Sequence, residues 1–258
     1  MPELPEVEAA RRKVERHARG KTIQSVEALD DTKVIRGIQP GEISHALSGK
    51  VLKRVRRKGK YLWLELDSKP AILVHLGMTG SLVFKGVKPS SYKSFSVDET
   101  SWPPRFWKVL VRFETGAEMA FVDSRRFGRF ELVDDPAREE PVRSLGDDAY
   151  LELGTVEGLH EKLSKRKQAI KAVLLDQKLL SGIGNWVADE VLYHSRIHPE
   201  VSSSSLTLKQ TKSLHASITT VLKTAVEAEA DASKFPRSWL FHYRWTGKKP
   251  SKIASGDQ

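Results

Sequence analysis

The chain has 258 residues, 39% of them hydrophobic and 29% charged, so it is long enough to bury a sizeable core and we expect two domains. Lysine and arginine outnumber aspartate and glutamate by 43 to 33, and this net charge of +10 favours a polyanionic partner, either nucleic acid or an anionic membrane. The sequence has no cysteine, which excludes disulfides and thiolate metal sites, and no apolar run of about eighteen residues that would indicate a membrane span. With no apolar leader either, we expect the protein in the cytosol, the nucleus or an organelle.

The first predicted element is an amphipathic helix over residues 5–19, ended by Gly20 as its C-cap. Pro5 suits the first turn of a helix, and Glu6 and Glu8 suit its positive end. By composition alone, the segment is typical of a well-capped helix start.

Pro2 gives the same segment a second interpretation. A small residue after the initiator methionine normally permits removal of Met1, which would leave the ring nitrogen of Pro2 as a free α-amine. Such an amine titrates near roughly 7.7 to 8.0, so part of it is unprotonated at neutral pH and can attack an aldehyde-like carbon to form a Schiff base. Glu3 could then move protons beside the amine, and Glu6 could bind the same group or position the amine.

Strand-like alternation follows in four stretches, which predicts antiparallel sheets and a sandwich-like first domain. These stretches are residues 22–29, 51–66, 71–84 and 108–133. Thr115 and Gly116 indicate a hairpin within the last stretch, and a cluster of glycine, serine and proline over 86–104 predicts a longer loop. Residues 135–150 are acidic and contain two prolines, so we interpret them as the linker between the domains.

A dense run of positive charge leads into the apolar part of the second stretch. It consists of Lys53, Arg54, Arg56, Arg57, Lys58 and Lys60. Such a run is often only a solvated face, but fixed cations near a nucleophile would also neutralise DNA phosphates. The residues alone leave both interpretations open.

Two further segments carry side chains that core packing alone does not readily explain. Met78 lies between two glycines, three residues after His75, where a long flexible side chain would project from a tight backbone. Arg125 and Phe127 follow Asp123 in what we interpret as another strand, and they pair a guanidinium with an exposed aromatic ring. A buried methionine and a hydrogen-bonded histidine are the ordinary alternative.

The second half is predicted to be helical. Around Gly182 and Gly184 the pattern indicates a helix, a glycine turn and a second helix. The two glycine amides could approach a phosphate closely, and Asn185 could cap the second helix, whose positive end favours an anion. A purely structural helix hairpin explains the periodicity equally well.

The final segments are less regular. A long helix is predicted over residues 206–230, behind a four-serine stretch that can cap it. Residues 239–245 form an aromatic, strand-like piece, and residues 247–252 form a basic tail that is compatible with nuclear import.

Residues 2–8, Pro-Glu-Leu-Pro-Glu-Val-Glu, resemble the amino terminus of the formamidopyrimidine-DNA glycosylase and endonuclease VIII family, bifunctional enzymes of base-excision repair. The segments around Lys60, Met78, Arg125 and Asn185 resemble the same family. The resemblance implies an α+β fold with a β-sandwich domain and amino-terminal helix over residues 1–134, the linker 135–150, and a helical domain with a helix-two-turns-helix motif over 151–234.

The resemblance also implies roles for particular residues. Pro2 would be the nucleophile, Lys60 and Asn185 would bind phosphate near the lesion, and three side chains would fill the gap left by an extruded nucleotide. We take as catalytic candidates Pro2, Glu3, Glu6 and Lys60. We take as DNA-binding candidates His75, Met78, Arg125, Phe127, Gly182, Gly184 and Asn185, of which Met78, Arg125 and Phe127 are the gap-filling three.

The carboxy-terminal segment departs from the family pattern. The family ends in a β-hairpin finger, zinc-bound or zincless, whose arginine reaches the phosphates around the flipped nucleotide. Without cysteine the zincless form is implied, and residues 235–239 resemble its plant and fungal branch. No Gly-Gly-Arg-Thr follows Lys252, so residues 235–258 are expected to form a truncated zincless finger and a basic tail without the finger arginine. No long loop precedes Phe235, so 8-oxoguanine is expected to be a poor substrate.

We therefore expect a bifunctional DNA glycosylase and abasic-site lyase that removes oxidised bases and cuts by β,δ-elimination through a Schiff base on Pro2. The expected partner is double-stranded DNA with oxidised bases or abasic sites, bound by a monomer that uses no metal, no other cofactor and no membrane. A nuclear location is expected, with an organelle as the alternative. Two other interpretations stay open, a damage-binding protein with weak or no catalysis and a nucleic-acid-binding module that shares only the fold.

Overall fold

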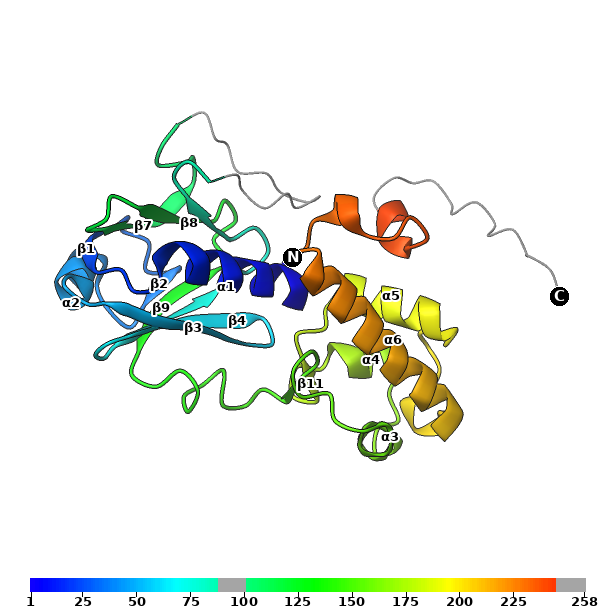
Figure 1. The fold of residues 1–258 in the computed structure, drawn as a ribbon. Coiled ribbons are helices and arrows are strands. Elements are labelled where there is room, and N and C mark those ends of the chain that lie inside the picture. Colours follow the sequence, from blue (N-terminus) through cyan, green and yellow to red (C-terminus); the bar gives the residue numbers. More distant parts are fainter. Residues whose placement is uncertain (88–100, 245–258) are drawn as a thin grey trace.

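The computed structural model describes residues 1–87 and 101–244, which form a β-sandwich followed by a bundle of helices (Figure 1). The two-domain α+β architecture expected from the sequence is confirmed. The amino terminus lies where the two domains meet, and the first helix runs from there along the sandwich (Figure 1). The end of the predicted loop 86–104 is described, but most of that loop, residues 88–100, and the basic tail 247–252 lie outside the described residues.

The first helix, α1 (Leu4–Ala18), begins one residue earlier than predicted. Its N-cap is Glu3, whose backbone N–H donates to the Glu6 carboxylate at 3.0 Å. Gly20 follows the C-cap residue Arg19 with a φ of +77°, a left-handed conformation that favours glycine. Val7 and Val14 of this helix are buried in the sandwich core.

The sandwich consists of two sheets. One has the order β1 (Ile23–Ala28), β7 (Trp107–Phe113), β8 (Glu118–Val122), β6 (Ser81–Phe84), with antiparallel pairing throughout. The other has the order β2 (Ile35–Arg36), β9 (Arg129–Val133), β5 (Ala71–His75), β4 (Tyr61–Leu66), β3 (Leu52–Lys58), with only the β2–β9 pair parallel. A short helix, α2 (Ile43–Leu47), packs on β1.

Three of the predicted strand stretches each contain more than one strand. The stretch 51–66 is the hairpin β3–β4, the stretch 71–84 holds β5 and β6 from opposite sheets, and the stretch 108–133 holds β7, β8 and β9. The hairpin predicted at Thr115 and Gly116 is confirmed, because β7 and β8 pair in antiparallel fashion on either side of that turn. At the other turns the alternation of apolar and polar residues continues, so the pattern alone did not show where the chain reverses. Left-handed glycines mark the turns, with φ of +55° at Gly59, +60° at Gly77 and +79° at Gly116.

The linker ends in β10 (Asp147–Asp148), which pairs in parallel with β11 (Leu180–Ser181) of the helical domain. The helices are α3 (Val156–Ser164), α4 (Ile170–Leu175), α5 (Asn185–Ser195) and α6 (Leu208–Glu227). Their shared apolar core also buries Leu4, so the first residue of α1 belongs to the core of the other domain. None of the helices described here is both long and apolar enough to cross a membrane.

Two local predictions in this half were wrong. Thr207, and not the serine run, caps α6, because its hydroxyl accepts the N–H of Gln210 while the serines form a 3₁₀ turn over Ser203–Ser205. The predicted strand over 239–245 is a 3₁₀ helix, Leu240–Tyr243, in its described part, and Trp245 lies outside the described residues. Phe241 turns inward there to meet the Trp186 ring edge-on at 5.0 Å, a contact that an extended strand with alternating exposure would not favour.

Candidate active site

Glu3 is held at the amino-terminal end of α5. Its side-chain oxygens accept the backbone N–H groups of Gly184 at 2.8 Å, Trp186 at 2.9 Å and Val187 at 3.1 Å. The residue is only 3% exposed. Burial raises the pKa of Glu3, and the three amides together with the Lys60 charge oppose that rise. These hydrogen bonds attach the start of the chain to the glycine turn, although Glu3 and Gly184 are 181 positions apart in the sequence.

This arrangement corrects the expected use of the glycine turn. The N–H of Gly184 donates to Glu3 and the N–H of Gly182 donates to Gln177 at 2.9 Å, so both amides are engaged within the protein. Gly184 is also the N-cap of α5, and Asn185, which was expected to cap it, is the first helical residue. Asn185 is exposed, and within the described residues its side-chain amide has no protein partner, which leaves it able to bind a phosphate.

Glu6 lies beside Glu3 in the same buried site. One side-chain oxygen accepts the Glu3 N–H at 3.0 Å, and the other accepts the indole N–H of Trp186 at 3.1 Å. Burial and then the neighbouring Glu3 carboxylate raise the pKa of Glu6 to about 8. Glu6 therefore keeps its proton at neutral pH and can act as a proton donor.

Lys60 provides the cation of this site from the turn between β3 and β4. It is 9% exposed, and burial lowers its pKa while the charges of Glu3 and Glu6 oppose the shift. The turn is fixed by Asp148, which accepts the backbone N–H of Gly59 at 2.7 Å. Sequence reasoning placed Lys60 within a strand, but only its position in the turn brings it to the two carboxyl groups.

Pro2 is buried next to Glu3, and Met1 is 46% exposed. With Met1 in place the ring nitrogen of Pro2 belongs to a peptide bond and has no nucleophilic lone pair. Removal of Met1 would expose that nitrogen beside Glu3. The Glu3 carboxylate is held in place there by its three hydrogen bonds from backbone N–H groups. The site thus unites the four catalytic candidates in one buried cluster, three from the amino terminus and one from the β3–β4 turn.

His75 stacks on Tyr61 with ring centroids 4.6 Å apart, and its Nδ1 accepts the backbone N–H of Gly77 at 3.2 Å. Burial and the nearby cations lower the pKa of His75 to about 4, so the ring is neutral at physiological pH. Because Nδ1 is an acceptor, the ring proton lies on Nε2, and that N–H is the donor His75 can offer to a ligand.

The three gap-filling candidates project from two neighbouring loops. Met78 lies in the turn between β5 and β6, while Arg125 and Phe127 lie in the loop between β8 and β9 and not in a strand as predicted. Phe127 is 44% exposed, and the Arg125 guanidinium lies 5.2 Å from the centre of its ring. A Cβ at Gly77 would lie 2.4 Å from the backbone of Phe127, so the two loops are in direct contact.

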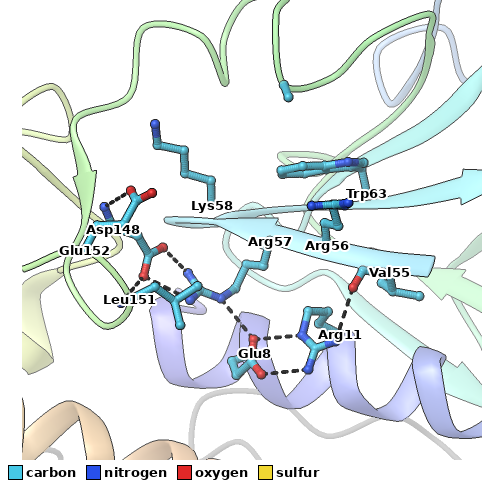
Figure 2. Close-up of a pocket in the computed structure, with 11 residues that line it drawn as sticks. Glu8, Arg11, Val55, Arg56, Arg57, Lys58, Trp63, Asp148, Leu151 and Glu152 are labelled. Atoms are coloured by element: carbon cyan, nitrogen blue, oxygen red, sulfur yellow. Dashed lines mark hydrogen bonds and ion pairs between the residues drawn. The ribbon is translucent and has the colours of Figure 1, made fainter.

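The basic stretch divides into two groups with different surroundings. Lys53, Arg54 and Arg56 are exposed on β3, whereas Arg57 is buried. Figure 2 shows Arg57 between Glu8 and Asp148, with its guanidinium 3.1 Å from the first and 2.5 and 3.0 Å from the second. Glu8, Arg57 and Asp148 line a surface hollow of about 450 Å³ at the domain junction.

Sequence reasoning missed the buried ion-pair cluster in which Arg57 binds Glu8 and Asp148. Arg57 lies two residues after the buried Val55, so strand alternation already placed it on the inward face. A buried arginine needs a carboxylate partner, which could have been inferred, but its identity depends on the linker's path.

Comparisons with known proteins give one consistent result. Residues 1–130 match the formamidopyrimidine-DNA glycosylase N-terminal domain, and residues 145–237 match the formamidopyrimidine-DNA glycosylase H2TH domain. The chain is 49% identical to formamidopyrimidine-DNA glycosylase of Arabidopsis thaliana over 98% of its own length, which is 64% of that relative. It is 34% identical to the protein of the same name from Herpetosiphon aurantiacus, covering 88% of this chain and 79% of the relative.

Solved structures agree with these matches. The structure is similar to that of Lactococcus lactis formamidopyrimidine-DNA glycosylase bound non-covalently to DNA containing an abasic site, with a TM-score of 0.74 and 29% identity. The similarity covers 90% of this chain and 84% of that one. A Lactococcus lactis enzyme in complex with DNA containing N7-benzyl-Fapy-dG matches with a TM-score of 0.73, over 88% of this chain and 79% of that one.

Proposed function

Because the chain belongs to the formamidopyrimidine-DNA glycosylase family, we propose that it is a bifunctional DNA glycosylase and abasic-site lyase of base-excision repair. Its substrate is double-stranded DNA that carries an oxidised base or an abasic site. The observation that carries this proposal is the buried cluster of interacting Glu3, Glu6 and Lys60, which lies at the amino terminus directly beside Pro2 in the chain.

In the proposed reaction, the free Pro2 nitrogen attacks the anomeric carbon of the damaged nucleotide and the glycosidic bond breaks as the base leaves. Glu3 assists ring opening by proton transfer at the sugar oxygen, and the resulting iminium acidifies the neighbouring C2′ hydrogen. Loss of that proton expels the 3′ phosphate, and a second elimination expels the 5′ phosphate. Glu6, with its pKa of about 8, holds a proton beside the amine at neutral pH.

The DNA-binding candidates other than Gly182 and Gly184, whose amides are engaged within the protein, fit the same proposal. Lys60, His75 and Asn185 each offer a donor toward phosphate, and Met78, Arg125 and Phe127 occupy the space left by the extruded nucleotide. Extrusion of a damaged base costs on the order of a few kcal/mol, which apolar and planar side chains partly offset. No metal or cofactor takes part in the proposed mechanism.

Borohydride trapping on abasic-site DNA tests the proposal. The protein should form a covalent adduct that Pro2→Gly abolishes, while Arg143→Ala, at a surface ion pair remote from the site, should leave trapping unchanged. Intact mass spectrometry of the same preparation should show that Met1 is absent. An adduct that survives Pro2→Gly would remove Pro2 as the sole nucleophile, and DNA binding without any adduct would identify a damage-binding protein.

The finer expectations belong to the same proposal. We propose a nuclear location, supported by the basic segment 247–252, and a zincless finger supported by the absence of cysteine. The segment 245–258 lies outside the described residues, and its contribution to DNA binding stays a prediction.

A further inference from the structure

Asp123, at the end of β8, connects the two loops that carry the gap-filling side chains. The loops are separated by more than forty residues of sequence, as the contact between Asp123 and Thr79 spans 44 positions. Asp123 is completely buried, with 0% of its surface exposed. Its carboxylate cannot touch DNA, so any function it has must be exerted through the loops.

The hydrogen bonds of Asp123 come from both loops. Oδ1 accepts the hydroxyl of Thr79 at 2.7 Å and the backbone N–H of Arg125 at 3.2 Å, and Oδ2 accepts the backbone N–H of Gly128 at 2.7 Å. Thr79 follows Met78 directly, and Arg125 and Gly128 flank Phe127 on either side.

Thr79 completes the connection. While its hydroxyl donates to Asp123, it also accepts the Ser124 hydroxyl at 3.3 Å and the backbone N–H of Arg125 at 3.2 Å. Removal of this one hydroxyl would therefore break every side-chain hydrogen bond shown between the turn of Met78 and the loop of Phe127 within the described residues.

A buried carboxylate without a cation needs all of its hydrogen bonds. No cationic side chain pairs with Asp123 among the described residues, so the three donors carry the whole solvation of its charge. If the Met78 loop moved away, the carboxylate would lose the Thr79 hydroxyl and keep only the two backbone donors of its own loop. The two loops are thus favoured in one common arrangement.

The backbones of the loops are also packed without space for a side chain. A Cβ at Gly128 would lie 2.7 Å from the Phe121 ring and 3.0 Å from Oδ2 of Asp123. A Cβ at Gly77 would lie 2.4 Å from the Phe127 backbone. Hydrogen bonding and close packing therefore act on the same two segments.

We propose that Asp123 is a positioning residue that makes Met78, Arg125 and Phe127 enter the duplex as one rigid unit. The inference rests on the proposed function, because it assigns Asp123 to the gap-filling step of that reaction. It adds that insertion is concerted, since Thr79 of one loop is hydrogen-bonded to Asp123 and Arg125 of the other.

A pair of matched variants tests this proposal. Thr79→Val replaces the hydroxyl by a methyl group of similar size, and Thr79→Ser keeps the hydroxyl. The probe is a duplex that contains a tetrahydrofuran abasic analogue with 2-aminopurine opposite it. Thr79→Val should bind this duplex about tenfold more weakly, because its loops are no longer linked before insertion, and should lose the 2-aminopurine fluorescence change. Thr79→Ser should behave like the unmodified protein in both measurements.

Two further measurements separate gap filling from folding and from chemistry. Borohydride trapping on single-stranded abasic DNA, which has no opposite base, should be the same for Thr79→Val and Thr79→Ser. Asp123→Asn should repeat the loss of duplex binding, because its amide offers hydrogen atoms to loop N–H groups that need an acceptor.

Equal duplex binding by the two Thr79 variants would overturn the proposal. It would also be overturned if Thr79→Val, but not Thr79→Ser, lost trapping on single-stranded DNA to the same extent as duplex binding. If the unmodified protein forms no adduct with any DNA, the proposed lyase function fails instead. The duplex binding and fluorescence measurements need no chemistry and would still decide the role of Asp123.

Discussion

At the scale of single residues, Glu3 and Glu6 have different surroundings although they are three positions apart. Glu3 accepts three amide hydrogen bonds from the start of α5, a setting that favours its ionised form against burial. Glu6 accepts one backbone N–H and one indole N–H beside that carboxylate, and its pKa rises to about 8. Burial still raises the pKa of Glu3 above its ordinary value, so both carboxyl groups of the site have raised pKa values, and only Glu3 has three amide donors and the Lys60 charge opposing the rise.

The pKa of Glu6 predicts how stability changes with pH. In the unfolded chain this carboxyl releases its proton near pH 4.5, whereas in the folded protein it keeps the proton to about pH 8. Between those values the folded state binds more protons, so Glu6 lowers the free energy of unfolding as pH rises. Glu6→Gln should become more stable relative to the unmodified protein by about 3 to 5 kcal/mol across this window, at about 1.4 kcal/mol per pKa unit. Urea denaturation at pH 5 and pH 8.5 measures this, and a constant difference would show that Glu6 ionises normally.

At the scale of elements, helix ends depend on single hydrogen bonds that composition only suggests. The four serines before α6 satisfy the sequence preference for a cap, but Thr207 makes the bond, and Gln210 returns one to the Thr207 backbone at 2.9 Å. The start of α5 differs, because its N-cap is Gly184 and the Glu3 side chain takes the place of a local capping group.

The cap of α6 gives a prediction with a nearby control. Thr207→Ala should lower the free energy of unfolding by about 1 kcal/mol, because the Gln210 N–H loses its acceptor. Ser204→Ala, in the exposed serine run, should change it by less than about 0.5 kcal/mol. Thermal or urea denaturation of the two variants measures both. A larger effect from Ser204→Ala would mean that the serine run and not Thr207 stabilises the helix start.

At the scale of the whole molecule, the two domains are joined by buried polar contacts and by α1, which contributes residues to the apolar core of each domain. Leu4 packs among the apolar residues of the helical domain, whereas Val7 and Val14 of α1 are buried in the sandwich core. Farther along α1, the Arg12 guanidinium donates to the backbone carbonyl of Val226 in α6 at 3.2 Å. Asp148 accepts hydrogen bonds from Arg57 and Gly59 of the β3–β4 hairpin and from the backbone N–H groups of Tyr150 and Leu151. The position of Lys60 relative to Glu3 therefore depends on contacts between domains.

Removing the charge of Asp148 should show how much the domain junction contributes to the free energy of unfolding. Asp148→Asn leaves the buried Arg57 with only one carboxylate partner and should lower the free energy of unfolding by about 3 kcal/mol or more. The control is Glu140→Gln, which neutralises an exposed acid paired with Arg143 and should leave the free energy of unfolding nearly unchanged. Urea denaturation of both variants measures the difference, and similar shifts would show that the buried pair does not hold the domains together.

The sequence by itself determined the local features of this protein. The period of apolar residues predicted α1, the strands and the helical second half, and the motif at Pro2 together with the segments at Lys60, Met78 and Asn185 predicted the family. Only the tertiary structure decided that the glycine turn binds Glu3, that Lys60 lies in a turn, and that Asp123 and Asp148 hold the loops around the site. The physical reason is that periodicity reports which side of an element is buried, whereas the partner of a buried polar group is chosen by the path of the whole chain.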